Sequence, residues 1–147
     1  MRYLLDTNIV YGWIKKYDFR QNIEKSFKPF SPANTPIISI VTVGEINALA
    51  LANGWGKRTR RDLESFLKRL VIIDINSEDI LQRYAEIYAF SQGRHPEKPL
   101  SSSARNMGKN DLWIAATASV VNGTLITTDK DFDHLHDEFL KLALVAV

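Results

Sequence analysis

The sequence contains no cysteine, and this excludes disulfide bonds, thiolate zinc sites and cysteine nucleophiles. It also has no apolar run that approaches the roughly 20 residues of a membrane helix. An ionised residue, Asp6, interrupts the N-terminal apolar stretch where the hydrophobic region of a secretory signal would lie. We therefore expect a cytoplasmic protein without membrane association. The net charge of +2 is too small to indicate nucleic-acid binding by itself, so the placement of charge matters more.

The length and composition are those of one globular domain. A chain of 147 residues is long enough to bury a sizeable core and too short for two domains. Hydrophobic residues make up 45% of the chain and charged residues 24%, a balance typical of globular proteins. We expect a single domain over residues 1–147, without internal repeats.

Apolar patterning predicts an α/β fold. Short apolar runs predict strands at residues 3–5, 37–40, 71–73, 125–128 and 142–145. Apolar residues at helical spacing predict helices at about residues 9–17, 19–27, 43–50, 60–70, 77–88 and 112–118. Because strands and helices alternate, we expect a twisted, mainly parallel sheet of about five strands flanked by helices.

Four acidic residues fall at the ends of these predicted elements. Asp6 and Asp129 follow strands, Glu45 lies in the first turns of the helix after the second strand, and Asp111 opens the helix before the fourth. The carboxyl ends of parallel strands share one edge of the sheet, and ligands bind at that edge in open α/β sheets. We therefore expect the four acids to lie close together.

Three of these acids also have a structural interpretation. Asp6 or Thr7 fits the N-cap of the helix that follows, where a side-chain oxygen satisfies a free backbone N–H. Glu45 lies three residues after Thr42, the predicted N-cap, which is the spacing of a capping box. Asp111 is favoured in a first helical turn by the helix dipole alone. The sequence leaves these interpretations open beside the functional one.

A cluster of four carboxylates requires protons or divalent cations. Two carboxylates about 4 Å apart repel by roughly 4 kcal/mol at an effective dielectric constant near 20. Among basic residues, only Lys109 and Lys130 lie in the immediate sequence neighbourhood of the acids. Oxygen ligands select hard ions such as Mg²⁺ or Mn²⁺, and such ions activate water for phosphodiester hydrolysis. We therefore hypothesise a metal-dependent phosphodiesterase.

Four segments around these acids resemble, in order and spacing, the acidic motifs of PIN-domain ribonucleases. The segments are Leu4-Leu5-Asp6-Thr7-Asn8, Val43-Gly44-Glu45-Ile46, residues 110–118 and residues 126–132. The likeness is closest to VapC-type toxins of prokaryotic toxin–antitoxin pairs, and it spans essentially the whole chain.

The resemblance implies a PIN-like fold and a Mg²⁺- or Mn²⁺-dependent endoribonuclease. It implies that the catalytic, metal-binding acids are Asp6, Glu45, Asp111 and Asp129. Their implied neighbours are Thr7, Asn8, Thr128 and Asp131, and for Asp131 a turn position is favoured over a role as a fifth ligand. The implied partners are an RNA substrate, with tRNA and rRNA as candidates, a second copy of the chain in a homodimer, and an antitoxin protein that covers the site.

Basic residues mark two candidate RNA-binding regions. The candidate contacts are Lys57, Arg58, Arg60, Arg61 and Arg105. The first four form the densest basic run, for which a solvated helix face is an equally good interpretation. Arg105 belongs to an aperiodic stretch from Ser91 to Gly108, which is larger than in many compact toxins. Loops this long are usually lids or binding loops, or else disordered, and the basic side chains here suit a lid that faces RNA.

Other features are weaker signals. Trp55 stands between glycines, where it suits base stacking, although a partner interface or local packing is favoured. His134 and His136 are too few for a zinc site, which needs three or four ligands, so we interpret them as surface residues. Two other functions remain open on the same fold: a housekeeping nuclease in RNA processing, and a catalytically silent module that binds RNA or protein.

Overall fold

Five strands form one fully parallel sheet in the computed structural model, which describes residues 1–147. The strands are β1 (Arg2–Leu5), β2 (Thr35–Ser39), β3 (Val71–Ile73), β4 (Thr124–Thr127) and β5 (Lys141–Leu144). Their order is β3-β2-β1-β4-β5, so β1 lies at the centre. The predicted α/β class is confirmed, and each strand matches a predicted one to within a few residues.

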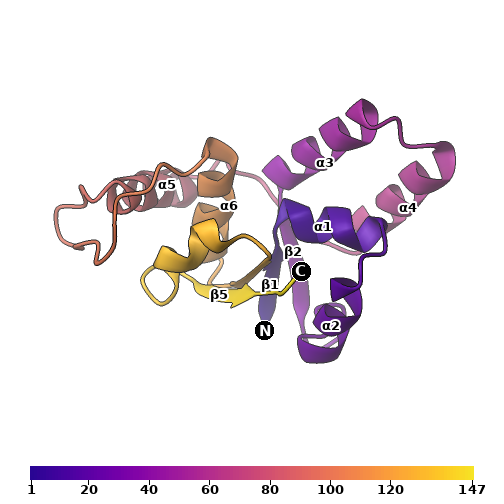
Figure 1. Cartoon of the computed structure of the whole chain (residues 1–147), viewed down its shortest axis with the longest axis horizontal. Coiled ribbons are helices and arrows are strands. Elements are labelled where there is room, and N and C mark those ends of the chain that lie inside the picture. The colour runs from indigo at the N-terminus through magenta and orange to yellow at the C-terminus, as the bar shows by residue number, and fades with distance from the viewer.

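Six α-helices and one 3₁₀ helix, η1, surround the sheet. They are α1 (Thr7–Ile14), α2 (Phe19–Ser26), α3 (Ile40–Ala52), α4 (Lys57–Leu67), α5 (Glu78–Ser91), α6 (Lys109–Val120) and η1 (Lys130–Leu135). Figure 1 shows α1 to α4 on one side of the sheet and α5 and α6 on the other. None of the helices has the length and apolarity needed to cross a membrane.

Alternating strand residues divide the core between the two faces of the sheet. Tyr3 and Leu5 of β1 pack with the apolar side chains of α1 to α4. Leu4, between them, packs with α5, α6 and η1 on the opposite face. This alternation follows from the two-residue period of a strand. Both faces are therefore covered by helices, as a parallel sheet requires.

The boundary between β2 and α3 differs from the prediction. Ser39 is the N-cap, and its hydroxyl accepts a hydrogen bond of 3.1 Å from the backbone N–H of Val41. The predicted cap, Thr42, is instead buried in the first turn of α3. The strand therefore passes into the helix without a loop, because Ser39 supplies a capping oxygen at the last strand residue. The first helix likewise ends at Ile14, three residues earlier than predicted.

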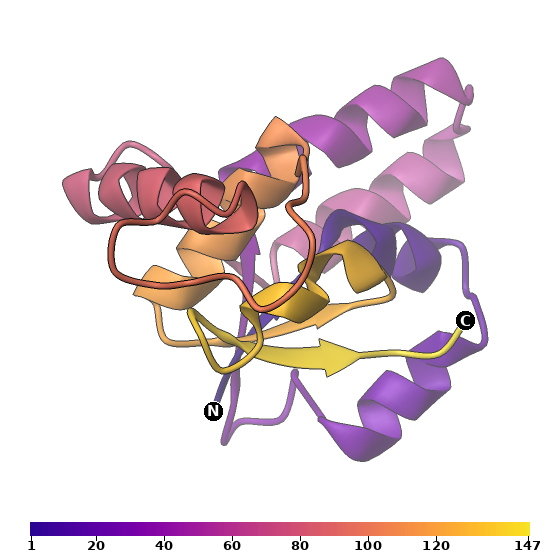
Figure 2. The ribbon, with the colours of Figure 1, turned by 60° about the vertical axis from the view of Figure 1, so that its left-hand side comes forward.

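The segment between α5 and α6 contains no helix or strand, in agreement with the sequence. Figure 2 shows this loop running beside η1. The bond from the backbone N–H of Arg105 to the carbonyl oxygen of Ser91, at 2.7 Å, attaches the loop to the end of α5. The loop is therefore tied back onto the body of the protein.

Close packing between α1 and α2 depends on a glycine. A Cβ atom at Gly12 would lie 2.1 Å from Cζ of Phe19, the first residue of α2. Only glycine allows the Phe19 ring, which is buried, to sit against the backbone of α1. The α1–α2 turn is thereby held beside the pocket described below.

We expect Gly12→Ala to lower the free energy of unfolding by about 1–3 kcal/mol, the usual cost of overpacking a core. Urea denaturation followed by circular dichroism measures this change. Gly44→Ala is the matched control, because Gly44 also lies in a helix but a Cβ there meets nothing within 4 Å. The control is expected to be about 0.5–1 kcal/mol more stable than wild type. Equal effects of the two substitutions would contradict the packing argument.

Candidate active site

An open pocket of about 450 Å³ lies beside the ends of β1 and β4, and all four predicted acids line it. Asp6 directly follows β1, Glu45 comes from α3, Asp111 from the first turn of α6, and Asp129 precedes η1. The fold thus collects in one place acids that are distant in the sequence. The predicted neighbours Thr7, Asn8 and Thr128 also line the pocket. Its apolar wall consists of Tyr11, Tyr17, Phe19, Leu49 and Val147.

Asp6 is both a helix cap and a member of this pocket. One carboxylate oxygen, Oδ1, accepts a hydrogen bond of 2.8 Å from the backbone N–H of Thr7 at the start of α1. The other, Oδ2, accepts a bond of 2.6 Å from the hydroxyl of Thr127 at the end of β4. The side chain is only 4% exposed. The capping interpretation is therefore correct for Oδ1. The other oxygen, Oδ2, connects the end of β1 to the end of β4.

Thr127 is the residue that sequence reasoning missed. Besides its bond to Asp6, its Oγ1 accepts a hydrogen bond of 3.0 Å from the backbone N–H of Asp129. It therefore connects two of the acids through one hydroxyl. The pairing of Leu5 with Ile126 brings Thr127 beside Asp6, and this register between distant strands has no signal in the sequence.

Glu45 does not form a capping box. Its Oε1 accepts a hydrogen bond of 2.7 Å from the hydroxyl of Thr7, which comes from α1. The Thr7 oxygen also lies 3.1 Å from that of Thr42. Because the helix begins after Ser39, Glu45 lies in its second turn and cannot reach back to the cap. The side chain is instead directed to the pocket by contact with another helix.

Burial and mutual repulsion raise the pKa values of two of the acids. Burial is the main cause that raises the pKa of Asp6 from 3.8 to about 6, against the opposing effect of its hydrogen bonds. Burial also raises the pKa of Asp111 to about 7, and the negative charges of Asp6, of Asp129 and of Glu45 add to the rise. Asp131 lies outside the pocket wall, but its charge contributes to the same rise.

No cation compensates these acids. None of the protein's ion pairs involves Asp6, Glu45, Asp111 or Asp129. The side-chain oxygen of Asn8 at the pocket is buried and has no hydrogen-bond partner. The four carboxylates and this orphaned oxygen are the kind of ligands that a hard divalent ion and its water prefer.

The acids do not already have the geometry of a metal site. No three histidine, aspartate or glutamate side chains in the protein are close enough together to hold one ion. Asp6 is fixed by its two hydrogen bonds, whereas the other three acids are only partly buried. A bound ion therefore requires the side chains of Glu45, Asp111 and Asp129 to turn inward around Asp6.

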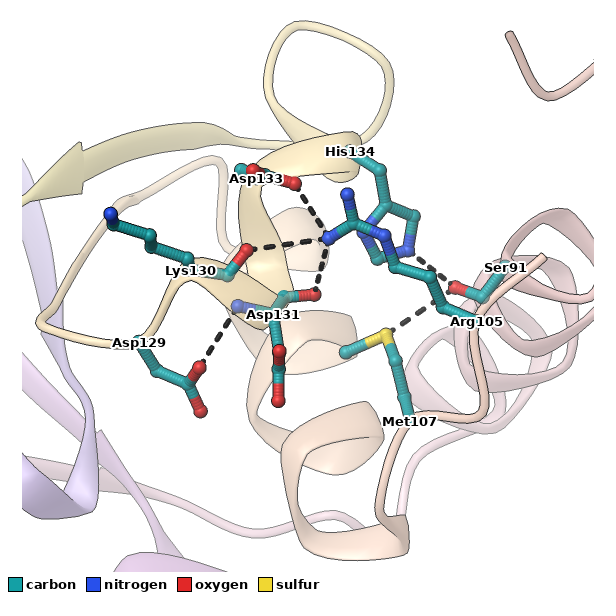
Figure 3. A network of polar contacts seen from close by, with 8 residues as sticks. All are labelled: Ser91, Arg105, Met107, Asp129, Lys130, Asp131, Asp133 and His134. Atoms are coloured by element: carbon teal, nitrogen blue, oxygen red, sulfur yellow. Dashed lines mark hydrogen bonds and ion pairs between the residues drawn. The ribbon is translucent and has the colours of Figure 1, made fainter. Parts of the chain in front are cut away.

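Arg105, predicted to contact RNA, forms several bonds within the protein. Its guanidinium Nη1 lies 2.6 Å from Oδ1 of Asp133 and also donates to backbone carbonyl oxygens of η1. Figure 3 shows these bonds together with the contact between Ser91 and His134. The guanidinium faces η1 and the side chain is 31% exposed, so an RNA contact at Arg105 stays a prediction.

The other predicted RNA contacts differ in their surroundings. Lys57, Arg58, Arg60 and Arg61 are all exposed on α4. Nε of Arg60 donates to the carbonyl oxygen of Trp55 at 3.0 Å. Arg58 alone among the four lines a second cleft, on the α1–α2–α4 side of the protein. That cleft collects the basic side chains Lys16, Arg20, Arg58 and Arg69 over the buried rings of Trp13 and Phe66.

Trp55 and the two histidines have structural roles. Trp55 is 7% exposed, and its ring centroid lies 5.6 Å from that of Tyr11, so local packing is the correct interpretation. Nε2 of His134 lies 2.7 Å from the hydroxyl of Ser91. Nδ1 of His136 accepts a bond of 2.9 Å from the backbone N–H of Leu142. Each imidazole thus has a protein partner.

Comparison with known proteins gives a consistent result. The family model described as PIN domain matches residues 3–138. "Ribonuclease VapC2" of Rickettsia felis is 29% identical over 144 residues, which are 96% of this chain and 97% of that protein. The crystal structure of VapBC2 from Rickettsia felis, bound to a DNA fragment from its promoter, superposes with a TM-score of 0.75 at 28% identity, covering 99% of both chains. A toxin-antitoxin complex from Klebsiella pneumoniae gives 0.60 at 26% identity, covering 88% of this chain and 89% of that one.

The raised pKa values predict how stability depends on pH. Between about pH 4 and pH 7 the folded protein retains protons on Asp6 and Asp111 that the unfolded chain has released. We therefore expect the contribution of these groups to stability to fall as the pH rises through this window in metal-free protein. Asp111→Asn removes one of the two groups with a raised pKa. We expect it to reduce the difference in melting temperature between pH 5 and pH 8.

Asp79→Asn is the matched control, because Asp79 also lies in the first turn of a helix but is exposed. It is expected to leave the pH dependence unchanged. If Asp111→Asn lost several kcal/mol at pH 8 relative to wild type, Asp111 would be a helix-stabilising residue and the repulsion argument would be wrong.

Proposed function

This chain belongs to the PIN-domain family, and on that premise we propose that it is a Mg²⁺- or Mn²⁺-dependent endoribonuclease that acts as the toxin of a toxin–antitoxin pair. The supporting observation is the pocket in which four carboxylates from distant parts of the chain meet without a cationic partner. The relative named ribonuclease VapC2 supports the same activity. We place it in the cytoplasm, as one catalytic domain over residues 1–147.

In this proposal Asp6, Glu45, Asp111 and Asp129 hold the metal ion. When bound, such an ion supplies a water activated for attack and stabilises the negative charge that develops on the phosphodiester. The protein's own contribution is orientation of the acids. The Thr127 hydroxyl holds one oxygen of Asp6, and the Thr7 hydroxyl holds one oxygen of Glu45. Hydrogen bonds of this kind orient ligating side chains and tune the affinity for the ion.

The other predicted neighbours have smaller roles in the proposal. Asn8 and Thr128 line the pocket and are available to an inner water or a substrate phosphate. Asp131 donates its backbone N–H to Asp129 Oδ1 at 2.9 Å. This bond suits the turn role for Asp131 better than that of a fifth ligand.

The substrate in this proposal is RNA, with tRNA and rRNA as candidates, and α4 contributes contacts to its phosphates. Lys16 and Tyr17 are adjacent in the α1–α2 turn, and the first lines the basic cleft while the second lines the acidic pocket. A single strand bound at the acids can therefore continue over this turn to the cleft that Arg58 lines. Lys57, Arg60 and Arg61 extend the positive surface along α4.

The proposed partners are an antitoxin and a second copy of the chain. The similar solved structures include VapBC2 from Rickettsia felis and a toxin-antitoxin complex from Klebsiella pneumoniae. In this protein, α3 leaves Ile40 at 40%, Leu49 at 37% and Leu51 at 74% exposure. In this proposal a partner protein covers these exposed side chains of α3.

We expect purified protein to cleave single-stranded RNA in the presence of Mn²⁺, and Asp6→Asn to lower the rate at least 100-fold, since even outer-shell partners of metal ligands cost 10–100-fold. Induced expression of the wild-type protein in cells is expected to arrest growth. Cells that express the Asp6→Asn variant are expected to grow normally. Asp79→Asn, an exposed acid distant from the pocket in the sequence, is the control that keeps both activities. Cleavage without growth arrest would favour the housekeeping nuclease, and binding without cleavage would favour the silent module.

The basic cleft generates a separate expectation. Binding of a fluorescent single-stranded RNA to the Asp6→Asn protein is measured at several salt concentrations. Removal of one phosphate contact by Arg58→Ala is expected to weaken binding and to reduce the slope of log Kd against log salt by about 0.7. Arg61→Ala makes the same charge change on the same helix but outside the cleft, so a smaller effect is expected. Equal losses in both variants would contradict a specific role of the cleft.

A further inference from the structure

The short helix η1 carries two acids next to the pocket and has little stability of its own. Asp129 is its N-cap and Asp131 lies in its first turn. 3₁₀ helices have poorer hydrogen-bond geometry than α-helices, so their shape depends on surrounding contacts. On the β4 side, the Asp129 backbone N–H donates to the hydroxyl oxygen of Thr127 at 3.0 Å. This bond restrains only the start of η1.

Arg105 binds η1 through several contacts from one side chain. Its Nη1 lies 2.6 Å from Oδ1 of Asp133. The same nitrogen donates to the carbonyl oxygens of Lys130, at 3.3 Å, and of Asp131, at 3.4 Å. Figure 3 shows the guanidinium projecting from the loop between α5 and α6 onto η1. Hydrogen bonds from a charged donor are stronger than neutral ones, so this one group restrains three residues of η1.

Arg105 is itself held in place by the loop. Its backbone N–H donates to the carbonyl oxygen of Ser91 at 2.7 Å. Ser91 is 1% exposed, and its hydroxyl lies 2.7 Å from Nε2 of His134 and donates to Sδ of Met107 at 3.3 Å. Ser91 at the end of α5 therefore binds both the loop and η1. The backbone from which the guanidinium projects is therefore anchored to α5.

The contacts of Arg105 are directed at the backbone of η1 and at Asp133, and the residue does not line the acidic pocket. We infer that Arg105 is a positioning residue of the hydrolytic site: it holds η1 in the conformation that places Asp129, the N-cap of η1, in the pocket with Asp6 and Asp111. This inference rests on the proposed function. It also gives the long loop between α5 and α6 a role, which is to deliver this arginine.

The test compares Arg105→Ala with Arg94→Ala. Arg94 lies on the same loop, is exposed and has no side-chain hydrogen bond or ion pair, so it makes a matched change in charge. Mn²⁺ affinity is measured by isothermal titration calorimetry on metal-free protein, and kcat and KM on a fluorogenic RNA. We expect Arg105→Ala to weaken Mn²⁺ binding about tenfold or more, as removal of supporting partners does. We expect kcat to fall with it while KM stays within about twofold, and Arg94→Ala to change none of these values.

Two results would overturn the inference. An unchanged Mn²⁺ affinity with a raised KM would make Arg105 an RNA contact. A lower melting temperature with unchanged Mn²⁺ affinity and kcat would make it a structural residue only. If Arg105→Ala does not fold, Asp133→Asn replaces it in the test. This variant loses the ion pair but keeps the bonds from Arg105 to the carbonyl oxygens of η1. We therefore expect it to lower the Mn²⁺ affinity by less than about tenfold. A wild-type protein that binds Mn²⁺ but leaves RNA intact would contradict the proposed function and not the role of Arg105. The Mn²⁺ affinities of the variants would still show whether Arg105 positions the acids.

Discussion

Repulsion among carboxylates that no lysine or arginine neutralises is the constraint on which the account of this protein depends. Asp6 is almost fully buried, and burial opposes its ionisation. The protein keeps it there by directing the Thr127 hydroxyl and the Thr7 backbone N–H at its two oxygens. These bonds orient the carboxylate without cancelling its charge. Such an arrangement costs stability in the absence of an ion, and sites that bind or react often carry this cost.

The topology explains why the acids meet where they do. The strand order β3-β2-β1-β4-β5 reverses direction at β1, and open α/β sheets bind ligands at such a switch point. Asp6 and Glu45 come from the α1–α3 side of the sheet, whereas Asp111 and Asp129 come from the α6–η1 side. The pocket is thus built jointly by both faces, so the two layers must be correctly packed before the acids meet.

Prediction from the sequence succeeded where the signal was local. Apolar runs located the strands, and acids placed after strands or in first helical turns identified the residues that line the pocket. It failed where one segment depends on another. The N-cap predicted at Thr42 was wrong because the strand passes directly into the helix at Ser39. The alternative interpretation of Glu45 as part of a capping box is wrong for the same reason, and Thr7 from another helix binds the Glu45 carboxylate. The roles of Thr127 and Arg105 depend on strand register and on loop placement, which nearby residues do not encode.

The most direct test of the central claim is anomalous diffraction from crystals of the wild-type protein soaked in Mn²⁺ at pH 8. The account predicts an Mn²⁺ peak inside the pocket, with the carboxylate of Asp6 among its ligands and the side chains of Glu45, Asp111 and Asp129 turned toward it. A pocket without such a peak, in which Lys109 or Lys130 pairs with the acids instead, would contradict it.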